Sequence, residues 1–382
     1  MRKGWEYKKL GEVCVYPSKR ILVSELNPKD YVGVENLQKD RAGVVFSDKM
    51  PNTNSAIAFS PNDILIGNIR PYLKKIWLAD KSGGASGDVV IIRISTNDLL
   101  PMFLYKVLAS DHFFEYDNTF TKGAKMPRGD RNAIAEFMIP LPPKSTQLAI
   151  VSELDKINEL IRLKKEQLKD FDNLAQSLFY EMFGDPVENE KGWEVKKLGD
   201  VCTDIKYGTS KPASENGRYT YLRMCNLTTD GFLDLSNTKQ IDIPDDEIEK
   251  CIVRYGDILF NRTNSIELVG KTCLFDKKEP MVIAGYIIRV RLNDTLLPVV
   301  LARMFNLASI KKLLRSMAKG AVNQANINSK ELASIRIPLP PLSLQRLFAQ
   351  RIEQIEREKS EVQKSIQDLE TLQASRMQYW FE

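Results

Sequence analysis

One proline-rich step occurs twice in this chain, each time ahead of a long helical pattern. MIPLPPKSTQLAIVSEL begins at Met138, and RIPLPPLSLQRLFAQRI begins at Arg336, 198 positions later. Other segments match in the same order, from WEYKKLG and WEVKKLG, which are 188 positions apart, to the Lys-Gly-Ala triplets that begin at Lys122 and Lys319. Ordered matches with slowly growing offsets indicate a duplicated domain with insertions in its second copy.

The repeat divides the 382 residues into two lobes and two long helices. β-Branched runs such as DVVIIRI and YIIRVRL alternate with turn clusters inside each lobe, and one short helix is predicted near 99–114 and again near 297–314. The predicted fold class is α+β, with two homologous mixed α/β domains, two long antiparallel helices and a pseudo-two-fold internal repeat. The expected boundaries are 1–143 for the first lobe, 144–184 for the first helix, 185–341 for the second lobe and 342–382 for the second helix.

Apolar residues follow a heptad pattern behind each proline step. Nine of ten a and d positions are apolar in the first helix, and seven of ten are apolar in the second. This spacing predicts a coiled-coil seam. An amphipathic helix that packs only on its own lobe is the alternative, and Lys164, which interrupts the first seam, either fixes helix register or extends its ammonium to solvent. The predicted seam residues are Ile150, Leu154, Ile157, Ile161, Leu168, Phe171, Leu178, Phe348, Ile352, Ile355, Val362, Ile366 and Leu369.

The connection between the first helix and the second lobe limits how the helices can meet. Proline cannot continue a helix backward, so each proline step sets where a helix starts, and Gly184 with Pro186 marks the end of the first helix. Only the eight residues 184–191 follow before the second lobe, and they span about 28 Å at most. For the two seams to meet, the second helix has to run antiparallel to the first. This predicts two lobes held apart by a two-helix rod.

Catalytic motifs are difficult to find in this chain. The single histidine, His112, lies among aromatic residues, and the five cysteines have no CxxC spacing, which disfavours zinc sites and Ser-His-Asp triads. GxGxxG, GxxxxGK[ST] and Asp/Asn-Pro-Pro-aromatic sequences are absent. The odd number of cysteines and the start without a signal-peptide core favour a reduced, cytoplasmic protein. No run of 18 apolar residues occurs, so no membrane span is expected.

Basic side chains concentrate in the lobes. Residues 1–143 carry 20 basic against 16 acidic side chains, and 191–341 carry 23 against 17, whereas 144–190 carry 6 against 10 and 342–382 carry 6 against 7. DNA-reading proteins with two-fold symmetry place their halves on half-sites a set number of base pairs apart. Two basic but different lobes therefore favour a protein that reads two different half-sites of double-stranded DNA.

The repeated motifs resemble the specificity subunit of Type I restriction–modification enzymes. The resemblance rests on GDILFNRTNS (Gly256–Ser265), on the Lys-Gly-Ala loop, and on IPLPP followed by Gln147 or Gln345, and it covers the whole chain. The first lobe departs from the pattern, because NDILIGNIRPYL lacks the glycine and spaces Arg70 differently from Arg262.

This resemblance implies two target recognition domains, each reading half of a bipartite, asymmetric sequence, joined by two conserved helices. It implies that two methyltransferase subunits dock on the chain and that motor-nuclease subunits can join them. S-adenosylmethionine and ATP would belong to those partners. The chain itself would be non-catalytic and would hold no cofactor or metal.

Candidate DNA contacts are chosen by side-chain chemistry. Arginine and lysine can bind guanine or phosphates, and asparagine and glutamine can bind adenine. A solvated surface role is the alternative for each residue, and Arg262 alternatively holds the GDIL turn together. The predicted DNA-binding residues are Lys19, Arg20, Asn68, Arg70, Lys122, Lys125, Arg128, Arg131, Lys206, Thr209, Ser210, Lys211, Arg262, Asn264, Lys319, Asn323, Gln324 and Asn326.

One motif suggests nuclease chemistry but is better explained by the repeat. Glu194-Val195-Lys196 follows Asp185, yet Glu6-Tyr7-Lys8 repeats the motif where no carboxylate precedes it. The motif is therefore expected to belong to the repeated fold. Two rival hypotheses stay open from the sequence: a coiled-coil scaffold whose lobes bind proteins, and a self-contained DNA modification enzyme.

Overall fold

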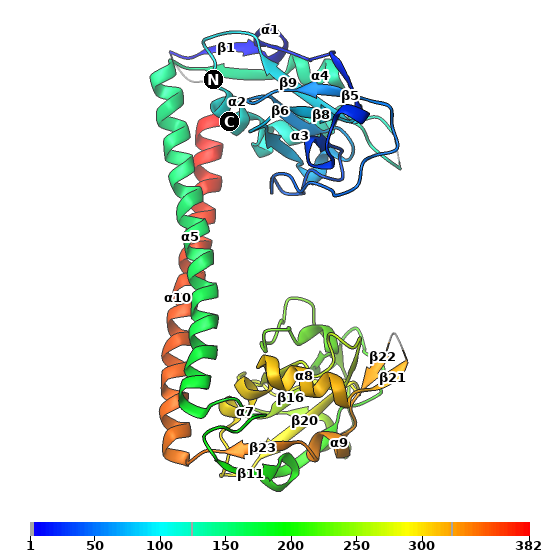
Figure 1. The fold of residues 1–382 in the computed structure, drawn as a ribbon, viewed down its shortest axis with the longest axis vertical. Helices are drawn as coiled ribbons and strands as arrows, with labels where there is room; N and C mark the ends of the chain where they lie inside the picture. The colour runs from blue at the N-terminus through cyan, green and yellow to red at the C-terminus, as the bar shows by residue number, and fades with distance from the viewer. Residues whose placement is uncertain (1–3, 124, 322–323) are drawn as a thin grey trace. The chain divides into compact units, whose positions relative to one another are not determined.

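The computed structural model describes residues 4–123, 125–321 and 324–382, which fall into two compact units. Unit 1 consists of Met1–Lys165 and Lys364–Glu382, and unit 2 consists of Glu166–Gln363. Two helices of 40 residues, α5 (Lys144–Phe183) and α10 (Leu342–Phe381), each contribute a segment to both units (Figure 1). Each unit therefore holds one β-rich lobe together with a segment of both long helices.

The lobe of unit 1 is built in layers of two sheets and a pair of helices. Ile66 of one sheet packs with Phe103 and Phe113 of the helices, while its neighbour Leu65 packs with residues of the other sheet. Successive strand residues point to opposite faces, so the first sheet is buried on both sides. The sheets have the orders β2 (Cys14–Val15), β9 (Val89–Ile94), β6 (Ile64–Gly67), β7 (Ile76–Leu78) and β3 (Arg20–Leu22), β5 (Ser55–Phe59), β8 (Gly83–Ala85), β4 (Tyr31–Val32).

The lobe of unit 2 repeats these layers. Phe260 packs toward the helices and Leu259 toward the other sheet, as the alternation along a strand requires. The repeated architecture confirms the predicted α+β fold class. The sheets have the orders β12 (Cys202–Tyr207), β20 (Ile287–Leu292), β16 (Ile258–Asn261), β18 (Thr272–Leu274), then β14 (Lys239–Ile241), β13 (Tyr219–Leu222), β19 (Met281–Ile283), β15 (Ile252–Val253), and β17 (Thr263–Asn264), β22 (Gln324–Asn326), β21 (Lys319–Ala321).

The short helix predicted in each lobe is two helices. In unit 1 these are α2 (Pro101–Leu108) and α3 (Asp111–Thr119), and in unit 2 they are α7 (Pro298–Phe305) and α8 (Ala308–Met317). The prediction of one continuous helix was wrong in unit 1 because Ser110 caps a new helix, its side-chain oxygen accepting a hydrogen bond from the Phe113 N–H. Smaller helices are α1 (Leu10–Val13), α4 (Arg131–Glu136), α6 (Ile248–Cys251) and α9 (Ser329–Ala333).

Each proline step begins with a β-strand that lies directly ahead of a long helix. β1 (Glu6–Lys9) pairs with β10 (Met138–Leu141), and β11 (Glu194–Lys197) pairs with β23 (Arg336–Leu339), both antiparallel and in matching register. The two prolines that follow each strand then place the first helical residue at Lys144 or Leu342.

These ladders also explain the Glu-x-Lys motif. Glu6 and Lys8 are two apart on one strand, so their side chains lie on the same face, and their charged groups approach to 3.2 Å. Glu194 and Lys196 form the same pair at 3.4 Å. The motif is thus part of the repeated ladder.

A buried glutamine explains the residue that follows each double proline. The Gln147 side chain accepts a hydrogen bond from Leu100 N–H (2.9 Å) and donates to the carbonyls of Asp98 (2.8 Å) and Pro142 (2.9 Å). Gln345 makes the equivalent three bonds with Leu297, Thr295 and Pro340, at 2.8, 3.0 and 2.8 Å. Both glutamines are fully buried, so each ties the start of a long helix to the loop ahead of α2 or α7.

The long helices run antiparallel to each other within each unit. In unit 1, Glu153 pairs with Arg376 and Lys165 pairs with Glu370. In unit 2, the rings of Phe179 and Phe348 pack edge to face at 5.6 Å. The predicted seam residues that are buried are Ile150, Leu154, Ile157, Ile161, Leu178, Phe348, Ile352, Ile355, Val362 and Ile366, and those half-buried are Leu168, Phe171 and Leu369.

Polar residues that interrupt the second seam meet polar partners on α5. Lys359, only 6% exposed, forms an ion pair with Asp172 at 2.5 Å, and Gln373 hydrogen-bonds Asn158. The carboxylate that binds Arg376 also accepts a hydrogen bond from the indole N–H of Trp380 at 3.1 Å. Each pair stays within one unit, and polar pairs of this kind select one register between two helices.

Replacing the buried glutamine of unit 2 tests its role. We expect Gln345→Leu to lower the free energy of unfolding by about 2 to 4 kcal/mol, because the Leu297 N–H loses its acceptor in a buried environment. Urea denaturation followed by circular dichroism measures the change. Gln354→Leu, at an exposed position of the same helix, is the control; a similar loss in both variants would contradict the assignment.

Candidate nucleic-acid interface

Arg262 of unit 2 lies where three segments of the lobe meet. It directly follows β16, its N–H donates to the Tyr286 carbonyl at 3.0 Å, and its own carbonyl accepts from the Ile327 N–H at 2.9 Å. The next residue, Thr263, is paired with Asn326 in the β17–β22 ladder. These backbone bonds connect the end of β16, the turn ahead of β20 and the late loop that contains the second Lys-Gly-Ala.

Asn68 of unit 1 occupies the same backbone position. Its N–H donates to the Asp88 carbonyl at 2.9 Å, and its carbonyl accepts from the Gly129 N–H at 3.1 Å. The next residue, Ile69, forms a bridge with Arg128. We call this arrangement the backbone frame. It consists of the two backbone hydrogen bonds of Asn68 or Arg262 and of the β-bridge at the residue that follows.

The backbone frame shows how the two copies correspond. Asn68 is equivalent to Arg262, Arg70 is equivalent to Asn264, and Arg128 is equivalent to Asn326. The different spacing of Arg70 and Arg262 in the sequence therefore does not reflect a shifted loop. The two arginines occupy different positions of one shared arrangement.

Side chains of the late loop in unit 1 are partly engaged with acidic or backbone groups. Lys122 pairs with Asp130 at 2.5 Å, Arg128 pairs with Asp88 at 3.1 Å, and Arg131 donates to the Gly87 carbonyl at 2.9 Å. The Ile69–Arg128 bridge and the bond from the Arg70 N–H to the Pro127 carbonyl, at 2.7 Å, bring this loop to the segment that contains Asn68 and Arg70. Lys125 is exposed and makes no side-chain hydrogen bond or ion pair with any described residue.

Lys19 and Arg20 lie in the second sheet of unit 1. Arg20 belongs to β3 and donates to the Ser55 hydroxyl at 2.8 Å, while the Lys19 carbonyl accepts from Ala58 N–H. Within the described ranges, no contact joins these two side chains to the backbone frame.

The KYGTSK segment of unit 2 borders the same turn as Arg262. The Thr209 carbonyl accepts from the Gly285 N–H at 2.8 Å, directly ahead of Tyr286. Lys211 pairs with Glu247 at 2.9 Å and Lys206 pairs with Asp204 at 3.3 Å, while Ser210 is exposed. The structure therefore brings Thr209 together with the backbone frame and engages the two lysines with acidic neighbours.

Three predicted residues of the second late loop lie at or beyond the edge of the described region. Lys319 and Gln324 belong to β21 and β22 by their backbones, and their side chains are not described. Asn323 lies outside the described residues.

Tyr207 is a functional candidate that the sequence reasoning did not single out. The Arg262 guanidinium lies over its ring at 4.9 Å, and its hydroxyl accepts a hydrogen bond from Ser329 N–H at 2.8 Å. In unit 1 the hydroxyl of Tyr16 donates to the Arg131 carbonyl at 2.9 Å. A tyrosine thus fixes the end of the late loop in both units, and its presence within KYGTSK was the available signal.

Asp117 of unit 1 is a buried carboxyl beneath the backbone frame. It is 1% exposed, and burial raises its pKa to about 6. A Cβ placed on Gly129 would lie 2.5 Å from its Oδ1 and 2.9 Å from the Oδ1 of Asn68, and neither oxygen has a hydrogen-bond partner among the described residues. Unit 2 has the fully buried Ile327 at the position of Gly129.

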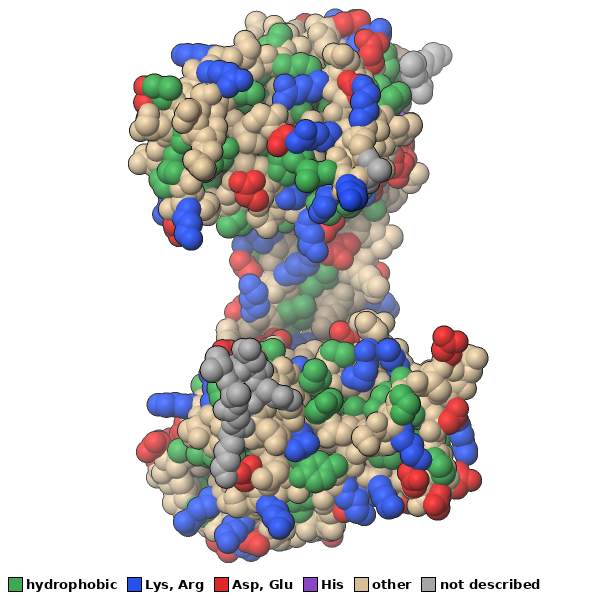
Figure 2. Space-filling model, turned by 90° about the vertical axis from the view of Figure 1, so that its right-hand side faces the viewer, with side chains coloured by type: hydrophobic (Ala, Val, Ile, Leu, Met, Phe, Trp, Pro, Cys, Tyr) green, Lys and Arg blue, Asp and Glu red, His purple; other side chains and the backbone are tan. Residues whose placement is uncertain are grey.

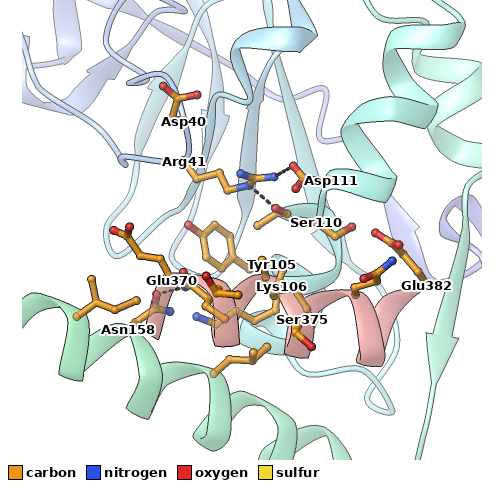
Figure 3. Close-up of a pocket in the computed structure, with 18 of the residues that line it drawn as sticks. Asp40, Arg41, Tyr105, Lys106, Ser110, Asp111, Asn158, Glu370, Ser375 and Glu382 are labelled. Carbon is orange, nitrogen blue, oxygen red and sulfur yellow. Dashed lines mark hydrogen bonds and ion pairs between the residues drawn. The ribbon is translucent and has the colours of Figure 1, made fainter. Parts of the chain in front are cut away.

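A cavity of unit 1, of about 1000 Å³, lies elsewhere, between α2 and the two long helices (Figure 3). Several of its charges are paired: Arg41 and Lys74 bind Asp111, and Lys165 binds Glu370 at 2.7 Å. The Ser110 hydroxyl in its wall is the cap of α3. Figure 2 shows lysine and arginine side chains spread over the viewed face of each unit, among acidic and apolar ones.

His112 and the five cysteines are, by residue type, possible functional residues, and they have the following surroundings. His112 packs against the Phe137 ring at 5.5 Å, and all five cysteines are free. In the part of the chain that the structure describes, no group of three or more metal-ligating side chains occurs. None of the described helices combines the length and apolar character needed to cross a membrane.

A family model matches nearly the whole chain. The model, described as Type I restriction modification DNA specificity domain, matches residues 2–170 and 190–371. The chain therefore belongs to this family, with one match on each copy of the repeat. The family resemblance predicted from the repeated motifs is confirmed.

Known relatives agree with this assignment. The chain is 31% identical over 166 residues to the putative type I restriction enzyme MjaX specificity subunit of Methanocaldococcus jannaschii, an alignment that covers 42% of this chain and 39% of that protein. It thus spans well under two thirds of this relative. The type I restriction enzyme MjaVIII specificity subunit of the same organism is 23% identical over 389 residues, which cover 95% of this chain and 90% of the relative.

A solved structure shares the fold. It comes from work on complex assembly and conformational transition of the type I restriction–modification system. It aligns with a TM-score of 0.67 at 23% identity and covers 100% of this chain and 98% of that one.

The raised pKa of Asp117 predicts a pH-dependent stability. Because the folded state holds the carboxyl proton more tightly than the unfolded state, stability is lost as the pH rises from about 4 to about 6. We expect Asp117→Asn to increase the free energy of unfolding by up to about 3 kcal/mol above pH 6 and to change it little near pH 4. Urea denaturation at both pH values measures this.

Asp245, whose side chain is 88% exposed, provides the control for that measurement. Asp245→Asn is expected to have the same small effect at both pH values. An Asp117→Asn effect that does not depend on pH would contradict the burial argument.

Proposed function

We propose that this chain is the sequence-reading subunit of a Type I restriction–modification system, with each unit reading one half of a bipartite, asymmetric DNA site. The observation that carries this is the backbone frame, which is the same in both units but bears different polar side chains. A shared backbone with exchanged side chains suits two readers of related geometry and different sequence. Family membership supports the proposal.

We also propose that methyl transfer takes place in partner subunits. The relatives are named specificity subunits, and the related structure comes from work on assembly of the complex. On this proposal two methyltransferase subunits dock on the chain and supply S-adenosylmethionine chemistry, and motor-nuclease subunits that use ATP can join them. The DNA is then bound by phosphate contacts that position it and by base contacts that select the sequence.

The helix pair would set the interval between the two half-sites. Each long helix continues without a break from one unit into the other, and its polar seam residues have specific partners on the opposite helix. A fixed register of this kind would make the number of unread base pairs a property of helix length.

Salt dependence distinguishes DNA binding from a protein scaffold. We expect affinity for labelled duplex DNA of random sequence to fall steeply between about 50 and about 200 mM salt, because phosphate contacts release counterions. Lys125→Gln should lower the slope of log K against log salt by about 1 without changing sequence preference. Fluorescence anisotropy of the full chain measures both quantities.

Lys278→Gln provides the matched control for loss of one charge. Ile258 pairs with Leu274, so the connection that follows β18 lies at the opposite end of β16 from Arg262. Its salt slope should equal that of the unchanged protein. Binding that is absent, or that does not respond to salt, would support the scaffold instead.

Shortening both helices together tests the interval. Deleting residues 162–168 and 363–369 removes one heptad from each helix at facing positions, about 10 Å of helix. We expect the preferred spacer to shorten by about three base pairs, since successive base pairs are about 3.4 Å apart. Sequencing of methylated sites, with methyltransferase present, measures it; changed half-site bases with the original spacer would contradict the proposal.

A further inference from the structure

The guanidinium of Arg262 is oriented by a ring but has no hydrogen-bond partner among the described residues. It lies 4.9 Å from the centroid of the Tyr207 ring and is half-buried, and its buried Nε has no acceptor among the described residues. Arg223 and Arg289 also have a buried Nε without an acceptor, but their Nη atoms donate to Asn237 and Asp204. Other half-buried arginines of unit 2 are paired, such as Arg291 with Asp257 at 2.8 Å and Arg303 with Glu356 at 2.6 Å. Arg262 therefore holds a preoriented cation whose donors are not used within the described protein.

Arg70 is the arginine of the frame in unit 1, although its position is equivalent to that of Asn264. Its side chain is exposed and makes no hydrogen bond or ion pair with any described residue. Its backbone has φ of 55°, in the left-handed region that non-glycine residues seldom adopt, and its N–H donates to the Pro127 carbonyl at 2.7 Å. The late loop thus holds an arginine in a conformation that the arginine itself disfavours, which is typical of functional positions.

The two units exchange arginine and asparagine within the backbone frame. Unit 1 has Asn68 at the first position and Arg70 two residues later, whereas unit 2 has Arg262 first and Asn264 two residues later. Each unit therefore has one arginine and one asparagine within the frame, in opposite order. The Asn68 Oδ1 is buried and the Asn264 Oδ1 accepts a hydrogen bond from the Ser265 N–H at 2.9 Å, so the arginine of each unit has the donors that no described residue uses.

The chemistry of these two side chains points to base recognition. The planar guanidinium can donate two parallel hydrogen bonds to O6 and N7 of guanine, and a carboxamide can bond N6 and N7 of adenine. A lysine ammonium at the same place keeps the charge but cannot reproduce the planar fork.

We infer that Arg262 and Arg70 each select a guanine in the half-site of their own unit, and that the exchange of arginine with asparagine makes the two half-sites differ. This inference rests on the proposed function. It assigns the base-selecting position in each unit, whereas Lys125 and similar exposed lysines contact phosphates.

Charge-preserving variants test the inference. We expect Arg262→Lys to lose preference for guanine at one base pair of one half-site, by roughly 10- to 100-fold, while affinity for random DNA and its salt slope stay unchanged. Arg70→Lys should do the same in the other half-site. The full chain, together with methyltransferase, is used to select DNA from a library in which both half-sites are randomised, and the bound molecules are sequenced.

Two further variants make the result specific. Lys278→Arg, at the opposite end of β16, should change neither half-site. The double variant Arg262→Asn with Asn264→Arg carries the order of unit 1 into unit 2 and should move the guanine preference within that half-site. Thermal melting of each variant shows that the fold is retained, because the frame uses only the backbone of these residues.

Each outcome decides the inference. Loss of guanine preference at one base pair of the expected half-site supports it. Unchanged preference in Arg262→Lys, or a uniform loss of affinity for all sequences, overturns it while leaving the proposed function intact. An unmodified chain that selects no sequence in the presence of methyltransferase overturns the proposed function and this inference with it.

Discussion

Two backbone hydrogen bonds at a single residue hold each candidate reading surface together. The N–H of Arg262 donates to the turn ahead of β20, and the N–H of Asn68 donates to the turn ahead of β9. The carbonyl of each residue accepts a hydrogen bond from the late loop of its own unit. Because only main-chain atoms take part, the side chain at this position is free to vary. A duplicated domain can therefore diverge in what it reads without losing the contacts that assemble its surface.

In the long helices, one set of residues supplies stability and another set specifies the register. Apolar seam residues supply burial, which is non-directional and tolerates several registers, whereas Lys359 with Asp172 and Arg376 with Glu153 are satisfied in one register only. Partly exposed ion pairs contribute little net stability, since solvent screening and desolvation offset their attraction. Their contribution here is to specify which residues of the two helices face each other.

Much of this could be predicted from the sequence, because duplication and periodicity are written in the order of residue types. The repeat, the α+β fold class and the family follow from matches such as WEYKKLG with WEVKKLG. The ungapped match of NDIL (62–65) with GDIL (256–259) also places Asn68 opposite Arg262. The main-chain hydrogen bonds that assemble the frame at this position could not be predicted, because backbone hydrogen bonds do not depend on residue type.

The partners of individual side chains could not be predicted from the sequence either. Lys122 and Lys211 were predicted as DNA contacts because they are basic, yet Asp130 and Glu247 bind them in the structure. Whether a cation is neutralised depends on distances of a few ångströms that only the folded loops define. The converse holds for Arg262, whose guanidinium is held over Tyr207 without an acidic partner among the described residues.

The buried carboxyl of Asp117 shows how a reading surface differs from the core that supports it. Below the frame of unit 1, the small Gly129 and the charged Asp117 take a place where unit 2 has the buried Ile327. Removing apolar volume and burying an ionisable group both lower stability. Such a local loss is tolerated because the lobe is stabilised elsewhere, by its apolar core and by Gln147 at the start of the long helix. The polar part of unit 1 beneath the frame thus lies directly beside Asn68, at the position where unit 2 has Arg262.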